Sequence, residues 1–420
     1  MPTKISPRLK SSRGRNLIKR HIIHHKSIYD FAEGRADMKD ILGGKGAVLA
    51  DMTHIGLPVP PGFIITTFTC NLYNINHDYP KDFWGELEMH VKKLEQLTGK
   101  IFGSEQNPLL VSVRSGAAIS MPGMMDTILN LGLNHRTIQG LIEKTGNERF
   151  CWDAYRRFIN MFGDVVIGMP HEEFEKIMDD LKAKYGVKLD TQLNTENLKE
   201  LTEKYRRLVV DYTGKKFPDD PSEQLRLAIE AVFKSWNNRR AIAYRRINKI
   251  TGLLGTAVNI QSMVFGNMGN TSGTGVAFTR NPSTGEKEFY GEFLVNAQGE
   301  DVVAGIRTPQ KISELKKVMP NIYKQLFDIQ KNLEHHYKNM QDIEFTIEEG
   351  RLFILQSRNG KRTAQAAIKI ATDMVKERLI TKAEAIKMVN PEQLNQLLHP
   401  TLPALYKGKI LCKGLAAYPG

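Results

Sequence analysis

The sequence is poor in cysteine and has no long hydrophobic run. Its three cysteines, Cys70, Cys151 and Cys412, are widely spaced and form neither a C-x-x-C pair nor a zinc-ligand pattern. This spacing excludes a disulfide framework and a thiolate zinc centre, and it favours a reducing compartment. No apolar run approaches the roughly 20 residues that a membrane-spanning helix needs. We therefore expect no membrane role.

Acidic side chains are absent from residues 1–26, which hold eight lysines and arginines of a chain whose net charge is +13. Such a stretch is typical of an organelle transit peptide or of a solvated tail, and an arm that binds nucleic acid is a third, less favoured interpretation. We expect a cytoplasmic protein, or an organellar one if these residues are a transit peptide. The histidines here lack the cysteine or carboxylate companions of a metal site; they are His21, His24 and His25.

The chain of 420 residues is too long for one ordinary core, and domain sizes predict about two to four units. From residue 27 the pattern is α/β (α+β). Glycines at 43–46 begin a helix, and short β-branched runs at 63–65 and 109–113 predict buried strands. Residues 137–216 show only helical spacing, which predicts a helical insert. One further helix is expected over 223–244.

Glycine-punctuated strands dominate the second half of the chain. Segments 257–265 and 275–279 predict two antiparallel strands joined by a Gly-rich turn. Segments 343–347 and 351–356 predict a hairpin whose turn, Glu348-Glu349-Gly350, ends in a glycine suited to positive φ. The expected units are a 1–26 extension, a 27–136 lobe, the insert at 137–216, a 217–360 lobe, a 361–405 helical linker and the start of a further domain at 406–420.

No segment has the spacing of a P-loop, so phosphate binding would need another framework. Lys45 lies in Gly43-Gly44-Lys45-Gly46 at a helix start, where a cation and the helix N-terminus can both act on phosphates. Arg114 directly follows a strand, and its guanidinium could bind two phosphate oxygens. The segment at 120–127, with Gly123 and Met124, suits a mobile lid over a nucleotide. An ordinary surface lysine and a packing loop are the alternatives.

Carboxylates on the predicted hairpin suit a magnesium site. Asp342 and Glu344 are two residues apart and so face one side of a strand, and Gln356 lies on the partner strand. Oxygen ligands with substrate phosphates completing the shell are what Mg²⁺ prefers. Arg358, on the same face as Gln356, could stabilise a moving phosphoryl group. A solvated charged face is the alternative interpretation.

These residues stand within long strings, at 109–134, 255–286 and 298–309, that resemble the ATP-binding region of the pyruvate phosphate dikinase family. The resemblance implies an ATP-grasp-like fold of two lobes with a helical insert, with Mg²⁺ as cofactor and ATP as substrate. It makes Lys45, Arg114 and Arg358 catalytic residues. It also implies two overlapping sets of ligands: ATP contacts at Lys45, Arg114, Gly123, Met124, Gln261, Glu300, Asp342, Glu344 and Gln356, and metal contacts at Asp342, Glu344 and Gln356.

The family reaction converts ATP, inorganic phosphate and pyruvate to AMP, pyrophosphate and phosphoenolpyruvate through a phosphohistidine. The sequence has no Thr-Ser-His-Ala string, so we expect the phosphohistidine and pyruvate-binding domains to be missing and to act in cis or in trans. The family is typically homo-oligomeric, and nucleic acid is not an expected partner. The alternatives are a non-catalytic nucleotide-binding fragment and the ATP-binding part of a related phosphoenolpyruvate synthase-type dikinase.

Overall fold

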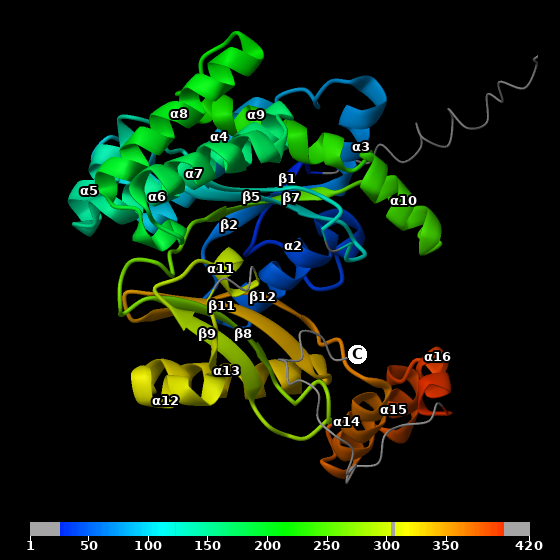
Figure 1. Ribbon diagram of the computed structural model, residues 1–420. Coiled ribbons are helices and arrows are strands. Elements are labelled where there is room, and N and C mark those ends of the chain that lie inside the picture. Colours follow the sequence, from blue (N-terminus) through cyan, green and yellow to red (C-terminus); the bar gives the residue numbers. More distant parts are fainter. Residues whose placement is uncertain (1–25, 122, 304–306, 399–420) are drawn as a thin grey trace, which may run out of the picture.

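A computed structural model describes residues 26–398 except 122 and 304–306. The predicted tail or transit peptide, with its histidines, and the predicted start of a further domain at 406–420 therefore lie outside the described residues. Within the described ranges no helix is long and apolar enough to cross a membrane. The described residues form two large antiparallel sheets with helices on their faces (Figure 1). The mixed helix-and-sheet class expected from the sequence is therefore confirmed.

The first sheet has the strand order β1-β2-β7-β5-β6, and all its neighbours pair antiparallel. Its strands are β1 (Ile28–Asp30), β2 (Gly62–Ile65), β7 (Ala257–Ser262), β5 (Val111–Gly116) and β6 (Thr127–Leu131). Every residue of β2 and β7 is buried, as expected for short apolar strands covered on both faces. A small parallel pair, β3 (Ile101–Phe102) with β4 (Pro108–Leu109), lies apart from this sheet.

Helices from two stretches of chain, residues 67–98 and 137–235, cover one face of the first sheet (Figure 1). Their apolar faces share one core with its strands. In the predicted insert the described residues fold as helices only, and Phe150, Phe158 and Tyr205 are all buried, as helical spacing requires. The helices are α3 (Thr67–Asn76), α4 (Phe83–Thr98), α5 (Thr137–Thr145), α6 (Glu148–Phe162), a π-turn (Gly163–Ile167), α7 (His171–Tyr185), a 3₁₀ turn (Asp190–Gln192), α8 (Thr195–Thr213) and α9 (Pro221–Ser235).

The single helix expected over 223–244 is instead two helices, α9 and α10 (Arg239–Ile247). The break falls before Asn238, whose backbone is extended and whose side chain accepts a hydrogen bond from the amide of Ala241. This is N-cap geometry, and asparagine is among the residues that favour it. The apolar spacing continues across the break, which is why periodicity alone joined the two helices.

Helix α2 (Lys39–His54) lies between the two sheets and packs against β7 of the first and β12 of the second (Figure 1). It is kinked at Gly43, whose φ is 70°, so the regular helix begins at Gly44 as the glycines predicted. A Cβ atom at Gly43 would lie 1.8 Å from the carbonyl oxygen of Gly116. Glycine is therefore required twice here, by the positive φ and by the close approach of two backbones.

The second sheet has the order β10-β9-β8-β11-β12, again antiparallel throughout. Its strands are β8 (Gly273–Phe278), β9 (Tyr290–Val295), β10 (Gln310–Lys311), β11 (Gln341–Glu348) and β12 (Arg351–Asn359). Its helices are α11 (Gly299–Val303), α12 (Leu315–Val318), which follows a 3₁₀ turn (Ile312–Glu314), and α13 (Pro320–Tyr337). Leu326 and Leu333 of α13 pack with Phe345 in a core that also includes Leu49 of α2.

The expected pairing of segments 257–265 and 275–279 is wrong. β7 is the central strand of the first sheet, whereas β8 lies in the second, so the glycine-rich residues between them carry the chain from one sheet to the other. The crossing is held at the tip of the hairpin: the Phe265 amide donates to Glu348 Oε2 at 2.6 Å, and the Gly350 amide donates to the Thr271 carbonyl at 2.9 Å. In the sheets, β7 pairs with β2 and β5 and β8 pairs with β9 and β11, so each strand has two partners, whereas in an isolated hairpin each would have one.

The expected hairpin is present as β11 and β12, with Glu349 and Gly350 at positive φ in the turn. After β12 the chain continues in helices, as the spacing predicted. These are α14 (Ala364–Lys376), α15 (Lys382–Met388), α16 (Pro391–Leu394) and a 3₁₀ turn (Asn395–Leu398). They form a small group beside the second sheet (Figure 1), and their core around Ile370 and Met374 also includes Met340, next to β11.

Candidate active site

A cavity of about 400 Å³ lies where the N-terminal end of α2, the end of β5, the loop after it and the β11–β12 hairpin meet. Four cationic side chains line it, and three of them come from three separate elements: Lys45, Arg114 and Arg358. Glu344 and Gln356 line it from the hairpin. We call this cavity the interlobe cleft, since its walls come from both sheets.

The N-terminal end of α2 is fixed against the end of β5. The Gly44 amide donates to the Ala117 carbonyl at 2.8 Å, and the next residue, Lys45, enters the cleft half-buried. No carboxylate pairs with Lys45 among the residues described here. Burial, together with the charges of Arg114 and Arg358, lowers the pKa of Lys45 to about 7, although Glu344 opposes this. A bound anion would favour the charged form of Lys45, because its negative charge offsets the neighbouring arginines.

Arg114 lies on β5, where its backbone carbonyl accepts a hydrogen bond from Asn259 Nδ2 of β7 at 3.2 Å. Its side chain is 14% exposed, and Nη2 is 3.7 Å from Glu344 Oε2. Burial lowers the pKa of Arg114, and Glu344 opposes that shift. Arginine stays protonated in proteins in any case, so Arg114 presents a fixed positive charge whose fork can bind phosphate oxygens.

The hairpin register places four polar residues in two facing pairs. Glu344 lies opposite Gln356, and Asp342 lies opposite Arg358. Gln356 Nε2 donates to Glu344 Oε1 at 3.2 Å, and Arg358 Nε donates to Asp342 Oδ2 at 2.7 Å. Burial raises the pKa of Asp342, although Arg358 offsets part of the shift. Burial acts in the opposite sense on Arg358, but the Asp342 partner raises its pKa above the usual value.

Comparison with known proteins decides the family. The model described as "Pyruvate phosphate dikinase, AMP/ATP-binding domain" matches residues 76–323 and 314–379. The chain belongs to this family.

Its relatives include two well-matched pyruvate phosphate dikinases. The chain is 56% identical over 405 residues to "Pyruvate, phosphate dikinase 1, chloroplastic" of Arabidopsis thaliana, an alignment covering 95% of this chain and 42% of that protein. It is 55% identical over 399 residues to "Pyruvate, phosphate dikinase" of Clostridium symbiosum, covering 94% and 46%. The chain thus spans less than half the length of the pyruvate phosphate dikinases it matches.

Most of the site residues that the dikinase resemblance implied meet in the interlobe cleft. Six of them line it, namely Lys45, Arg114, Gly123, Glu344, Gln356 and Arg358. Asp342 lies behind Arg358 and is 6% exposed. Met124 is half-buried beside the cleft, and its carbonyl accepts a hydrogen bond from Asn238 Nδ2 at 3.0 Å.

Two expected nucleotide contacts are not placed in the cleft. Gln261 is buried in β7, where its Nε2 donates a hydrogen bond to the Pro60 carbonyl at 3.0 Å. Its side-chain amide therefore binds the backbone just before β2. Glu300 belongs to α11, but its side chain lies outside the described part of the structure. The geometry therefore gathers the predicted cations and hairpin residues in one cavity and leaves Gln261 outside it.

Sequence reasoning missed several residues that line the cleft. Lys39 begins α2 six positions before Lys45, and Tyr337 ends α13. The charge of Lys39 at the same helix end was a signal that could have identified it. Tyr337 carried no such signal, because only the return of α13 to the cleft places it there.

The described residues contain no group of three or more histidine, cysteine, aspartate or glutamate side chains that could hold a metal ion alone. The available donors are the carboxylates of Glu344 and Asp342 and the amide of Gln356. These are hard oxygen ligands, too few for a metal held entirely by protein, but suited to one whose shell substrate phosphates complete.

Proposed function

We propose that the interlobe cleft binds ATP with Mg²⁺ and transfers a phosphoryl group from it. The observation that supports this best is the convergence of Lys45, Arg114 and Arg358 from three elements on one cavity that also contains Glu344. Such an arrangement suits a polyphosphate, because transfer needs cations on the non-bridging oxygens and carboxylates for the metal.

Each cleft residue has a separate part in this proposal. Lys45 and Arg114 bind and orient the phosphates. Arg358 leaves its ion pair with Asp342 and binds the phosphoryl group during its transfer. Glu344, Gln356 and Asp342 would hold the metal, with Gln356 contributing the carbonyl oxygen left over when its nitrogen donates to Glu344. When bound, Mg²⁺ neutralises charge on the phosphates and orients them. The loop of residues 117–127 then excludes water from above the site.

We further propose the complete dikinase reaction for the protein to which this region belongs. ATP and inorganic phosphate would give AMP and pyrophosphate while a histidine of a separate phosphohistidine domain takes up the phosphoryl group, and pyruvate would receive it elsewhere. The sequence contains no Thr-Ser-His-Ala string, so in this proposal the acceptor histidine is supplied from outside the chain.

Titration calorimetry of ATP into the chain, with and without Mg²⁺, tests the cleft. We expect Mg²⁺-dependent binding that weakens by about tenfold or more in Arg114→Ala, since a charge-assisted hydrogen bond is worth about 1.5–3 kcal/mol. Glu344→Gln should lose the Mg²⁺ dependence while keeping part of the affinity. The matched control is Arg351→Ala, an exposed arginine at the hairpin turn.

Equal affinity in Arg114→Ala and the wild type would contradict the assignment of the cleft. Tight ATP binding without AMP release, even after a phosphohistidine domain is added, would instead identify a nucleotide-binding module that does not transfer phosphate.

We propose a cytoplasmic location, with an organelle as the alternative. The relatives include proteins called chloroplastic and one from Clostridium symbiosum without that word, so the family occurs in both settings. Residues 1–26, which contain no Asp or Glu, would direct the protein to an organelle if they are a transit peptide. A fluorescent reporter fused to them should stay in the cytosol, and its import into an organelle would decide for the alternative.

A further inference from the structure

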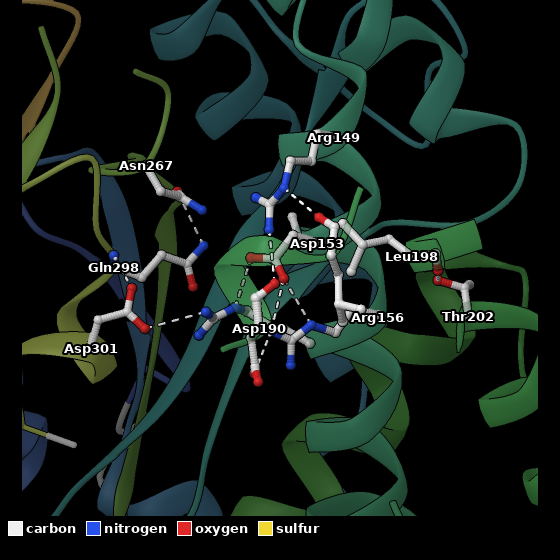
Figure 2. Close-up of polar contacts among 12 residues, drawn as sticks. Arg149, Asp153, Arg156, Asp190, Leu198, Thr202, Asn267, Gln298 and Asp301 are labelled. Carbon is white, nitrogen blue, oxygen red and sulfur yellow. Dashed lines mark hydrogen bonds and ion pairs between the residues drawn. The ribbon is translucent and has the colours of Figure 1, made fainter. Parts of the chain in front are cut away.

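A second polar cavity, of about 440 Å³, lies between the helical insert and the second sheet. Its walls come from α6, from the turn at residues 190–191, and from residues near both ends of α11. None of its lining residues lines the interlobe cleft. Figure 2 shows its centre, where Arg149, Asp153 and Arg156 of α6 face Asp190 on one side and Asp301 with Gln298 on the other.

The carboxylates around this cavity are matched by neighbouring cations. Asp153 receives hydrogen bonds from Arg156 Nε at 2.8 Å and Arg157 Nε at 3.0 Å. Asp190 is paired with Arg156 at 3.2 Å, and Asp301 with Arg157 at 3.2 Å. Burial alone would raise the pKa of Asp153, but the surrounding arginines lower it to about 2. All three carboxylates therefore already have cationic partners.

Two further arginines, Arg149 and Arg307, line the cavity without a carboxylate partner among the described residues. Arg149 donates from Nε to the Leu193 carbonyl at 2.7 Å and from Nη2 to the Asp190 carbonyl at 3.0 Å. Arg307 donates to the carbonyls of Asn296 and Val295, both at 2.8 Å. Neither makes an ion pair with a carboxylate in the described ranges, and Arg149 acts on Asp153 only at longer range. Neutral carbonyls orient both guanidinium groups but leave their charge uncompensated.

Three asparagine amides add donors to the same wall. Asn147 Oδ1 accepts from the Phe150 amide at 3.1 Å, and Asn296 Oδ1 accepts from the Gly269 amide at 3.1 Å. Asn267 Oδ1 accepts from Gln298 Nε2 at 3.3 Å. Their oxygens are thus occupied, and no described residue accepts a hydrogen bond from their Nδ2 groups. The cavity presents arginine and amide N–H groups in excess of acceptors, which is the reverse of a cation site.

We propose that this cavity is a second anion site, which holds a compact tetrahedral oxyanion between Arg149 of α6 and Arg307 after α11. Inorganic phosphate and the phosphoryl group of a phosphate monoester share this chemistry. The bound anion joins the insert to the second sheet, because the two arginines come from those two parts of the molecule. The site is independent of the function proposed for the interlobe cleft.

Equilibrium dialysis of radiolabelled inorganic phosphate against the full chain tests the site, with a non-hydrolysable ATP analogue and Mg²⁺ present to occupy the cleft. We expect saturable binding that weakens about tenfold or more in Arg307→Gln and in Arg149→Gln. Arg114→Ala, in the cleft, should leave it unchanged, as should Arg351→Gln, which removes an exposed arginine elsewhere. Thermal melts identify any variant that fails to fold.

The competitor chosen decides the source of the anion. Displacement of the phosphate by glycerol phosphate would show that the site accepts monoesters, whereas failure to displace it would restrict the site to free phosphate. Three results would overturn the proposal: no phosphate bound to the wild type, loss of binding in Arg114→Ala but not in the Arg149 and Arg307 variants, or equally good displacement by malonate, a dicarboxylate that has no tetrahedral oxyanion.

Discussion

At the scale of single residues, Lys45 differs clearly from an ordinary lysine, because its pKa is lowered to about 7. Its ammonium group shares the cleft with Arg114 and Arg358, and among the described residues Glu344 opposes their effect on its pKa. A pKa of about 7 means that the free protein holds Lys45 largely neutral above that pH. A bound polyphosphate would favour the charged form, so ligand and proton should bind together.

ATP affinity is therefore expected to fall as the pH rises from about 7 to about 9, by at most tenfold per pH unit. Proton uptake on binding at alkaline pH should be visible by calorimetry in buffers with different ionisation enthalpies. Lys45→Arg removes the titration and should flatten the profile, whereas Lys45→Met should bind weakly at every pH. The same slope in wild type and Lys45→Arg would assign the titration to another group.

The placement of the polar residues on the hairpin could be predicted from the sequence, because the alternation of side chains along a strand is a local property. Asp342 and Glu344 share a face, and Arg358 and Gln356 lie opposite them. The pairing among them could not, since the 2.7 Å contact between Arg358 and Asp342 depends on side-chain conformation. Gln261 shows the same limit. Its place in β7 was predictable, but its bond to the Pro60 carbonyl depends on which strand pairs beside it.

At the scale of elements, the junction of α2 with β5 positions the cleft. Gly43 makes the kink, and the carbonyls of Gly116 and Ala117 contact the turn that follows. The glycines at 43–46 predicted a helix start. They lie against the end of β5, which follows them by about 70 residues in the sequence, so a local pattern could not predict this contact.

Gly43→Ala is expected to destabilise the fold for two reasons. The backbone of Gly43, at φ 70° and ψ 163°, lies in a region that is essentially reserved for glycine and costs other residues about 1–3 kcal/mol. The added Cβ would also lie 1.8 Å from the Gly116 oxygen. Gly56→Ala is the matched control, because Gly56 has a φ of 76° and nothing within 4 Å of the added Cβ. Urea unfolding should show a clearly larger loss for Gly43→Ala, accompanied by weaker ATP binding. Equal losses would mean that the backbone contact relaxes at no cost.

At the scale of the whole molecule, one buried arginine joins the second sheet to the helices that follow it. Arg280, at the end of β8, is fully buried and donates to Glu334 of α13 and to Glu377 after α14, each through two hydrogen bonds. Lys287 reaches the same Glu377 from the exposed side at 2.7 Å. The sequence offered no sign of this cluster, whose members are 54 and 97 residues from Arg280.

Arg280→Met is expected to cost about 3–5 kcal/mol, because it leaves the buried Glu334 carboxylate without its partner. Lys287→Met, which removes the exposed cation from Glu377, should cost no more than about 1 kcal/mol. Hydrogen exchange should show that α14 opens more readily in the first variant only. Similar protection of α14 in both would assign its position to the apolar core around Ile370 instead.

The order of strands in the first sheet also has a consequence for biosynthesis. β7 lies between β2 and β5, yet it is made some 140 residues after β5. A nascent chain that has emerged only as far as α10 therefore holds two strands with open edges and no partner to join them. The first lobe can close only once residues 257–262 leave the ribosome, so the crossing to the second lobe begins at the moment the first is completed.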